Sequence, residues 1–153
     1  MLRFNHMELT LPPGPLTDEF RADVDAFYAD VLGWQNKMVP ILGTHGYLMQ
    51  PDSGQFILLL ESDDHMQSPG YDHLGLLADS RAEVDRIMAE CQAFADQDDR
   101  MQLKFYDDLV SPSVTVHAFY VRYLLPIWFD VQSMERPPGQ GPERSWQFVS
   151  SSP

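Results

Sequence analysis

Residues 4–11, FNHMELTL, and residues 71–78, YDHLGLLA, decide the fold because they open two copies of one unit. Apolar and polar residues alternate in the first stretch, which is typical of a strand with one buried face. Each stretch carries a histidine at its third position, His6 in the first copy and His73 in the second. This repeat indicates that one βαβββ-type unit occurs twice.

The ends of the two copies also correspond. Residues 45–58 align with residues 117–130 without a gap, at a constant offset of 117 − 45 = 72 residues. The alignment places Leu58 of the first copy opposite Asp130 of the second, each in the last strand of its unit. Together with the two opening histidines, this carboxylate makes a donor set typical of a three-ligand metal site with open positions.

Between these ends, each copy has an amphipathic helix followed by strands. Thr17 is placed to cap the first helix and Gly33 to end it. Ser80 and Glu83 form a capping box at the start of the second helix. The expected strands lie at residues 3–11, 34–39, 44–50 and 55–61 in the first copy and at residues 71–78, 101–106, 114–122 and 127–132 in the second.

These patterns divide the chain into a first module at residues 1–62, a second module at residues 63–134 and a C-terminal tail at residues 135–153. With 153 residues, 44% of them hydrophobic, the chain is large enough to bury a core, so we expect one domain or two intimate halves. The tail is rich in Pro, Gly, Ser and Gln, which predicts a flexible segment, with Trp146 and Phe148 as side chains that could dock.

The chain is strongly acidic, with 10 Lys and Arg against 23 Asp and Glu and a net charge of −13. Because it has no basic stripe, we expect no binding to nucleic acid or to an anionic membrane surface. No apolar stretch approaches the roughly 20 residues that span a bilayer, and the N-terminus does not resemble a signal peptide. The single cysteine, Cys91, excludes an internal disulfide and favours a reducing compartment, so the expected localisation is cytoplasmic.

Each candidate ligand also has an interpretation without a metal. A lone histidine on a strand is usually a hydrogen-bonded polar group, and the equivalence of His6 and His73 in two copies is what favours a shared cavity. Asp130 lies in an apolar run, where a carboxylate is costly unless it is paired or binds a cation. The alternative for Asp130 is a hydrogen-bonded structural role. Two histidines and one carboxylate would suit Fe(II), Mn(II) or Zn(II).

After the first histidine come FYADVLGW at residues 27–34, YDHLGLLADS at residues 71–80, AFYVR at residues 118–122 and IWFDVQ at residues 127–132. This order resembles the vicinal oxygen chelate superfamily, which includes glyoxalase I, extradiol dioxygenases, fosfomycin-modifying enzymes and bleomycin-binding proteins. The similarity covers roughly residues 3–134. It implies an α+β fold of two βαβββ modules, whose curved, half-barrel sheets carry their helices outside. It also implies metal ligands at His6, His73 and Asp130.

A local similarity is to extradiol dioxygenases, in which a tyrosine precedes the glutamate ligand by ten residues. Tyr120 and Asp130 have this spacing, since 130 − 120 = 10. The resemblance implies that Tyr120 is a hydrogen-bonding acid near substrate and oxygen; the alternative is an ordinary strand tyrosine. His117, a candidate general base, lies on the opposite strand face from Tyr120, so at most one of them faces the cavity unless a bulge intervenes.

Three features depart from the family pattern. Asp130 is shorter than the usual glutamate, so its strand must approach the metal more closely. Residues 123–126, YLLP, replace a D-P-x-G turn, and such an apolar turn suggests contact with another surface, for example a partner subunit. Leu58 excludes a fourth ligand like that of glyoxalase I, and Glu61 lies on the opposite strand face from Leu58 and is not expected to replace it.

We therefore expect a homodimeric, metal-dependent enzyme acting on a small organic molecule that chelates a divalent ion (Fe, Mn or Zn) through vicinal oxygens. The spacing of Tyr120 and Asp130 narrowly favours dioxygenase-like chemistry, with glyoxalase-type lyase or isomerase chemistry as the close alternative. A different class is a non-catalytic protein that sequesters a hydrophobic or drug-like ligand. Its cavity would need no metal and would be lined by Phe56, Leu58, Leu60 and Trp128.

Overall fold

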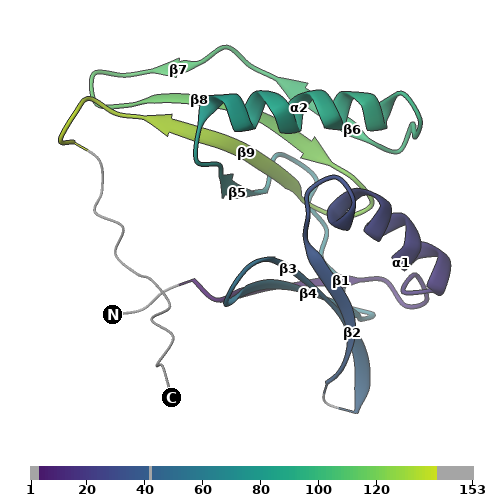
Figure 1. Ribbon diagram of the computed structural model, residues 1–153. Coiled ribbons are helices and arrows are strands. Elements are labelled where there is room, and N and C mark those ends of the chain that lie inside the picture. Colours follow the sequence, from purple (N-terminus) through teal and green to yellow (C-terminus); the bar gives the residue numbers. More distant parts are fainter. Residues whose placement is uncertain (1–3, 42, 141–153) are drawn as a thin grey trace, which may run out of the picture.

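The two units form two separate sheets in the computed structural model, which describes residues 4–41 and 43–140 (Figure 1). The fold is α+β, with one βαβββ-like module in each sheet and with both parallel and antiparallel strand pairs. The predicted fold class is confirmed. Within the described ranges, no helix combines the length and the apolar character needed to cross a membrane.

The first sheet, sheet A, has the strand order β1-β4-β3-β2. β1 runs parallel to β4, because the helix after β1 carries the chain across the sheet before two antiparallel hairpins return it. The elements of this module are β1 (His6–Leu11), α1 (Asp18–Val24), the π-helical turn η1 (Asp25–Ala29), β2 (Gln35–Ile41), β3 (Thr44–Asp52) and β4 (Gln55–Glu61).

The second sheet, sheet B, has the order β5-β9-β8-β6, and β7 pairs with β8 beside β6. The elements of this module are β5 (His73–Leu77), α2 (Arg81–Ala95), β6 (Gln102–Phe105), β7 (Leu109–Val110), β8 (Thr115–Arg122) and β9 (Trp128–Glu135). The sequence patterns did not indicate β7, which has only two residues. β9 includes Glu135, the first residue of the expected tail, whereas Trp146 and Phe148 lie outside the described residues.

Both helices begin where the sequence predicts. The Thr17 side chain accepts a hydrogen bond from the Phe20 backbone N–H at 3.2 Å, and the Ser80 side chain accepts one from the Glu83 N–H at 3.2 Å. The first helix widens into the π-helical turn η1, and Gly33 follows it with a positive φ of 75°. Local capping chemistry therefore determines where each helix starts.

One hydrophobic core joins the two modules. The Phe27 ring of η1 packs against Phe94 of α2 and against Tyr123, at centroid distances of 5.3 and 5.5 Å. The buried Tyr28 hydroxyl donates a hydrogen bond to the Tyr123 carbonyl oxygen at 2.8 Å. Tyr123 belongs to the apolar turn at residues 123–126, so the surface that this turn contacts is the first module of its own chain.

Because side chains alternate along a strand, each sheet has a second face that points away from this core. We call these the outer face of sheet A and the outer face of sheet B. Figure 1 shows α2 lying along β6, β8 and β9, and its residues Val84 and Cys91 join the core on the inner side of sheet B. The described helices pack on the core side, so they leave the two outer faces uncovered.

Candidate metal-binding face

His73 and Asp130 lie side by side on the outer face of sheet B, on the neighbouring parallel strands β5 and β9. The His73 Nε2 atom is 3.9 Å from the Asp130 Oδ2 atom. The other ring nitrogen, Nδ1, is 2.7 Å from the Tyr71 backbone carbonyl oxygen. Since a carbonyl only accepts, Nδ1 carries the proton, and the lone pair of Nε2 in neutral His73 is turned toward Asp130.

Asp130 is a buried carboxylate with one oxygen left unpaired. Its exposed fraction is 8%, and within the described part of the chain its Oδ1 atom is buried without a hydrogen-bond partner. Burial raises the pKa of Asp130 above its usual value, against the opposing effects of His73 and Tyr120. A buried carboxylate oxygen without a partner is costly unless it binds a proton or a cation. His73 Nε2 and the Asp130 carboxylate therefore fit a divalent metal ion.

Tyr120 completes the group on this face. It is the direct neighbour of Asp130 in the antiparallel pairing of β8 with β9, and its ring meets the His73 ring edge-on at a centroid distance of 5.1 Å. Burial and the nearby charge of Asp130 raise the pKa of Tyr120. The hydroxyl therefore stays protonated at neutral pH and can donate a hydrogen bond, either to Asp130 or to a bound molecule.

A cavity of about 660 Å³ opens in front of Tyr120 and Asp130. This volume lies within the range of sites that hold small organic molecules. The lining combines tyrosine rings, acidic and amide groups and short apolar side chains: Tyr71, Tyr106, Asp107, Asp108, Leu109, Val116, Ala118, Tyr120, Asp130 and Gln132.

His6 lies on the outer face of sheet A, where its ring stacks on Phe56 at a centroid distance of 4.8 Å and an angle of 4°. Its Nδ1 atom is 2.8 Å from the Asn5 Oδ1 atom. The Asn5 amide nitrogen donates to the Gly54 carbonyl oxygen at 2.9 Å, which fixes the side chain with its oxygen toward His6. The His6 Nε2 atom of the neutral ring therefore also keeps a free lone pair.

Among the described residues, no group of three His, Cys, Asp or Glu side chains is close enough to hold a metal ion. The chain brings His73, Tyr120 and Asp130 together but leaves His6 on the other sheet. The physical reason is the shared core: both modules bury their inner faces in it, so the outer faces that carry the candidate ligands point apart.

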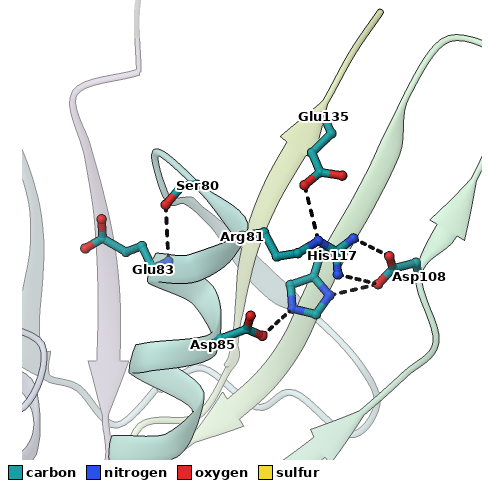
Figure 2. Close-up of polar contacts among 7 residues, drawn as sticks. All are labelled: Ser80, Arg81, Glu83, Asp85, Asp108, His117 and Glu135. Carbon is teal, nitrogen blue, oxygen red and sulfur yellow. Dashed lines mark hydrogen bonds and ion pairs between the residues drawn. The ribbon is translucent and has the colours of Figure 1, made fainter.

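His117 lies on the inner side of sheet B, facing α2 rather than the cavity (Figure 2). Its Nε2 atom is 2.9 Å from Asp85 Oδ1 and its Nδ1 atom is 2.8 Å from Asp108 Oδ1. Burial lowers the pKa of His117, but hydrogen bonds to Asp108 and Asp85 outweigh it and leave the pKa above its usual value. Of the two catalytic candidates, only Tyr120 lines the cavity; the sequence parity of β8 predicts this separation.

Glu61 is also engaged elsewhere, since its Oε1 atom accepts a hydrogen bond from the Leu16 backbone N–H at 2.7 Å. Leu58 is buried, with 4% of its surface exposed, and pairs in register with Glu8 of β1. Of these two positions, Leu58 has no donor atom and Glu61 is held by the Leu16 backbone.

The sequence patterns did not indicate the two cations, Lys104 and Arg122, that lie beside His73 and Asp130. The Lys104 Nζ atom lies 3.6 Å from the Tyr71 ring centroid and 4.3 Å from the Trp128 ring, and the Arg122 Cζ atom lies 4.8 Å from the Trp128 ring. Strand parity places Arg122 on the face of Tyr120 and Trp128 on the face of Asp130. Strand parity could therefore have placed Arg122 and Trp128 on one face. The position of Lys104 beside Trp128 depends on the register of β6 with β8.

Solved structures share this fold, although no family model and no curated protein matches the chain. A predicted glyoxalase family protein from Bacillus anthracis superposes with a TM-score of 0.60 and 14% identity, covering 88% of this chain and 97% of that one. The fosfomycin resistance protein FosX from Listeria monocytogenes superposes with a TM-score of 0.60 and 15% identity, covering 86% and 90%. This chain has the fold of these proteins.

The fold that the resemblance to the vicinal oxygen chelate superfamily implies is thereby confirmed. One FosX structure contains Mn(II) and sulfate and matches this chain with a TM-score of 0.60 at 14% identity, covering 87% of this chain and 90% of that one. Another, of a FosX mutant, contains Mn(II) and 1S,2S-dihydroxypropylphosphonic acid. At such low identity the likeness establishes architecture, and the chemistry of this chain has to be argued from its own residues.

Proposed function

We propose that this protein is a divalent-metal-dependent enzyme whose site is shared between two copies of the chain. His73 and Asp130 of one copy and His6 of the other would hold the ion. The observation that carries the proposal is the unpaired, buried Asp130 Oδ1 atom beside a His73 Nε2 atom that is 3.9 Å from Oδ2.

The need for a second copy follows from the two outer faces. Each presents an Nε2 lone pair, from His6 on sheet A and from His73 on sheet B, and each ring has its Nδ1 atom held by an acceptor. A homodimer that lays the outer face of sheet A of one copy over the outer face of sheet B of the other would complete the set of two histidines and one carboxylate. It would also enclose the cavity beside Tyr120.

A divalent ion bound there would supply a Lewis acid that polarises vicinal oxygens of the substrate. Tyr120 would donate a hydrogen bond to a substrate oxygen, since its raised pKa keeps the hydroxyl protonated. Leu58 leaves the corresponding position of sheet A without a ligand, so the substrate could provide two donors. Dioxygenase-like chemistry is the narrow first choice, because Tyr120 pairs directly with Asp130, and glyoxalase-type lyase or isomerase chemistry is the second.

The test is Mn(II) binding measured by titration calorimetry on purified protein. We expect binding in the wild type and its loss in His6→Ala, His73→Ala and Asp130→Asn, with the exposed His45→Ala as the matched control. Co-expressed His6→Ala and Asp130→Asn chains should regain half of the sites in the mixed dimer, since one of its two sites is intact. Binding that His6→Ala does not affect, or no regain in the mixed dimer, would contradict a shared site.

A non-catalytic binding protein is the second candidate, favoured by the apolar character of sheet A around Leu58, of which 4% is exposed. Metal content separates the two candidates, because a sequestering cavity needs no ion. Purified protein that binds neither Mn(II), Fe(II) nor Zn(II) would favour the binder. If metal binds, oxygen uptake with a catechol and Fe(II) separates dioxygenase chemistry from isomerisation of a hemithioacetal.

A further inference from the structure

Two cations lie on the outer face of sheet B without a carboxylate partner among the described residues. The chain has 10 basic and 23 acidic residues, so carboxylates are abundant. The described ion pairs of arginine involve Arg21, Arg81, Arg86 and Arg100. Lys104 and Arg122 instead lie over aromatic rings, and the Arg122 side chain donates a hydrogen bond to the neutral Gln102 side chain at 2.8 Å.

The strand register places these cations beside the candidate metal ligands. Lys104 pairs with Tyr120, which pairs with Asp130, which pairs with Gly75, so these positions form one row across the sheet. The adjacent row contains Gln102 and Arg122, which pair with each other, and His73 and Trp128, which pair with each other. Neighbouring strands are about 4.8 Å apart, so a small molecule held at His73 and Asp130 can reach both cations.

The cavity lies on the side of Tyr120 away from Arg122 and includes aromatic and apolar side chains. The Tyr106 and Tyr120 rings meet edge-on at a centroid distance of 5.5 Å. Ala118, Val116 and Leu109 lie further along the lining, which also contains the carboxylates of Asp107 and Asp108. On the outer face of sheet B, Lys104 and Arg122 thus lie in the rows of Asp130 and His73, and the cavity lies on the other side of Tyr120.

We propose that Lys104 and Arg122 form a subsite for the anionic group of an aromatic organic acid, whose ring system occupies the cavity lined by tyrosines. The subsite would make an aromatic organic acid the substrate of the enzyme proposed above, so it rests on that proposed function. A net charge of −13 repels anions at long range, so an anionic ligand needs local cations. Arg and Lys bind carboxylates through charge-assisted hydrogen bonds, and Trp128 holds both side chains in place through its ring face.

The experiment compares 2-naphthoate with 2-naphthamide, which has the same ring system and no charge, by titration calorimetry of the full chain. We expect the wild type to prefer the carboxylate by about tenfold or more, as for a charge-assisted hydrogen bond. Lys104→Gln and Arg122→Gln should each lower naphthoate affinity several-fold, and the double variant should bind both compounds equally. Arg86→Gln removes the same charge from the exposed side of α2 and should keep the preference.

Equal binding of both compounds by the wild type would overturn the subsite, as would a preference that survives in the double variant. A double variant that dissociates into monomers and loses both compounds equally would also overturn it, because the cations would then bind the second copy. Mn(II) titration of the double variant separates the two proposals. A double variant that keeps its Mn(II) affinity and loses the preference for the carboxylate supports both the metal site and the anion subsite. A wild type that prefers naphthoate and binds no Mn(II) supports the subsite and contradicts the metal function.

Discussion

The outer faces of the two sheets come from the same unit of sequence and differ in what they carry. On sheet A, the histidine of the first strand stacks on Phe56, and the last strand presents the buried Leu58. On sheet B, the corresponding histidine faces the buried carboxylate of Asp130, with Tyr120 beside it. One scaffold thus carries a leucine in the last strand of sheet A and a carboxylate at the matching position of sheet B.

The packing of the two modules explains why His6 lies apart from His73 and Asp130. The strands that carry the ligands also supply the inner faces, and those inner faces build one common core. Burying both inner faces together turns both outer faces away from each other. Two copies of the chain would supply two complementary pairs of faces, and so two complete sites.

Among exchanges of residues between the two sheets, we expect the largest effect at Asp130. Asp130→Leu gives sheet B the residue of sheet A, and we expect Mn(II) affinity to fall by at least about a hundredfold, because a metal ligand is lost. The melting temperature should stay the same or rise, since a buried carboxylate with one unpaired oxygen is removed. Calorimetry and thermal unfolding measure both effects, with Gln132→Leu on the same strand face as the control. A clear fall in melting temperature would show that Asp130 has a structural partner.

The reverse exchange, Leu58→Glu, gives sheet A a carboxylate. Leu58 is buried and lies in register with Glu8, so the metal-free protein should lose roughly 2–4 kcal/mol of unfolding free energy. Mn(II) should recover part of this loss and bind more tightly than to the wild type, while any activity falls because a substrate position is occupied. Leu58→Met, which keeps the volume without the charge, is the control. A loss of stability that Mn(II) does not reduce would contradict the placement of Leu58 at the metal site.

The smallest effect concerns the polar cluster on the inner side of sheet B, where His117 lies among Asp85, Asp108, Arg81 and Glu135 (Figure 2). The pKa of His117 is raised in the folded state, so its contribution is complete below its unfolded pKa of about 6.5 and is lost as the pH rises through the folded value. His117→Gln should therefore cost about 0.5–1 kcal/mol of unfolding free energy near pH 6 and less at pH 9. The cost is small because Asp85 is exposed and its charge is screened by solvent.

Chemical unfolding across this pH range measures the contribution of His117. The corresponding residue of the first module, His45, is exposed, and His45→Gln serves as the control. A penalty for His117→Gln that grows with rising pH would show that the neutral form of His117 is the stabilising one.

The positions of the site residues on their strands could be predicted, because alternation along a strand is a local property. The parity of β8 places Tyr120 and His117 on opposite faces, and the parity of β9 places Asp130 on the outer face with Trp128. The contact of the turn at residues 123–126 could not be predicted, because an apolar turn fits a partner subunit or the chain's own core equally well. In the structure the turn contacts the chain's own core, and the Tyr28 hydroxyl donates a hydrogen bond to the Tyr123 carbonyl oxygen.

The sequence by itself determined the two βαβββ units, the starts of both helices and the strand faces of His6, His73 and Asp130, since capping and alternation depend on residues close in the chain. The tertiary structure alone decided which faces are buried together, that His6 lies apart from the other two, and that Lys104 and Arg122 flank Trp128. These outcomes depend on packing between segments far apart in the chain and on strand register, which no short stretch of sequence specifies.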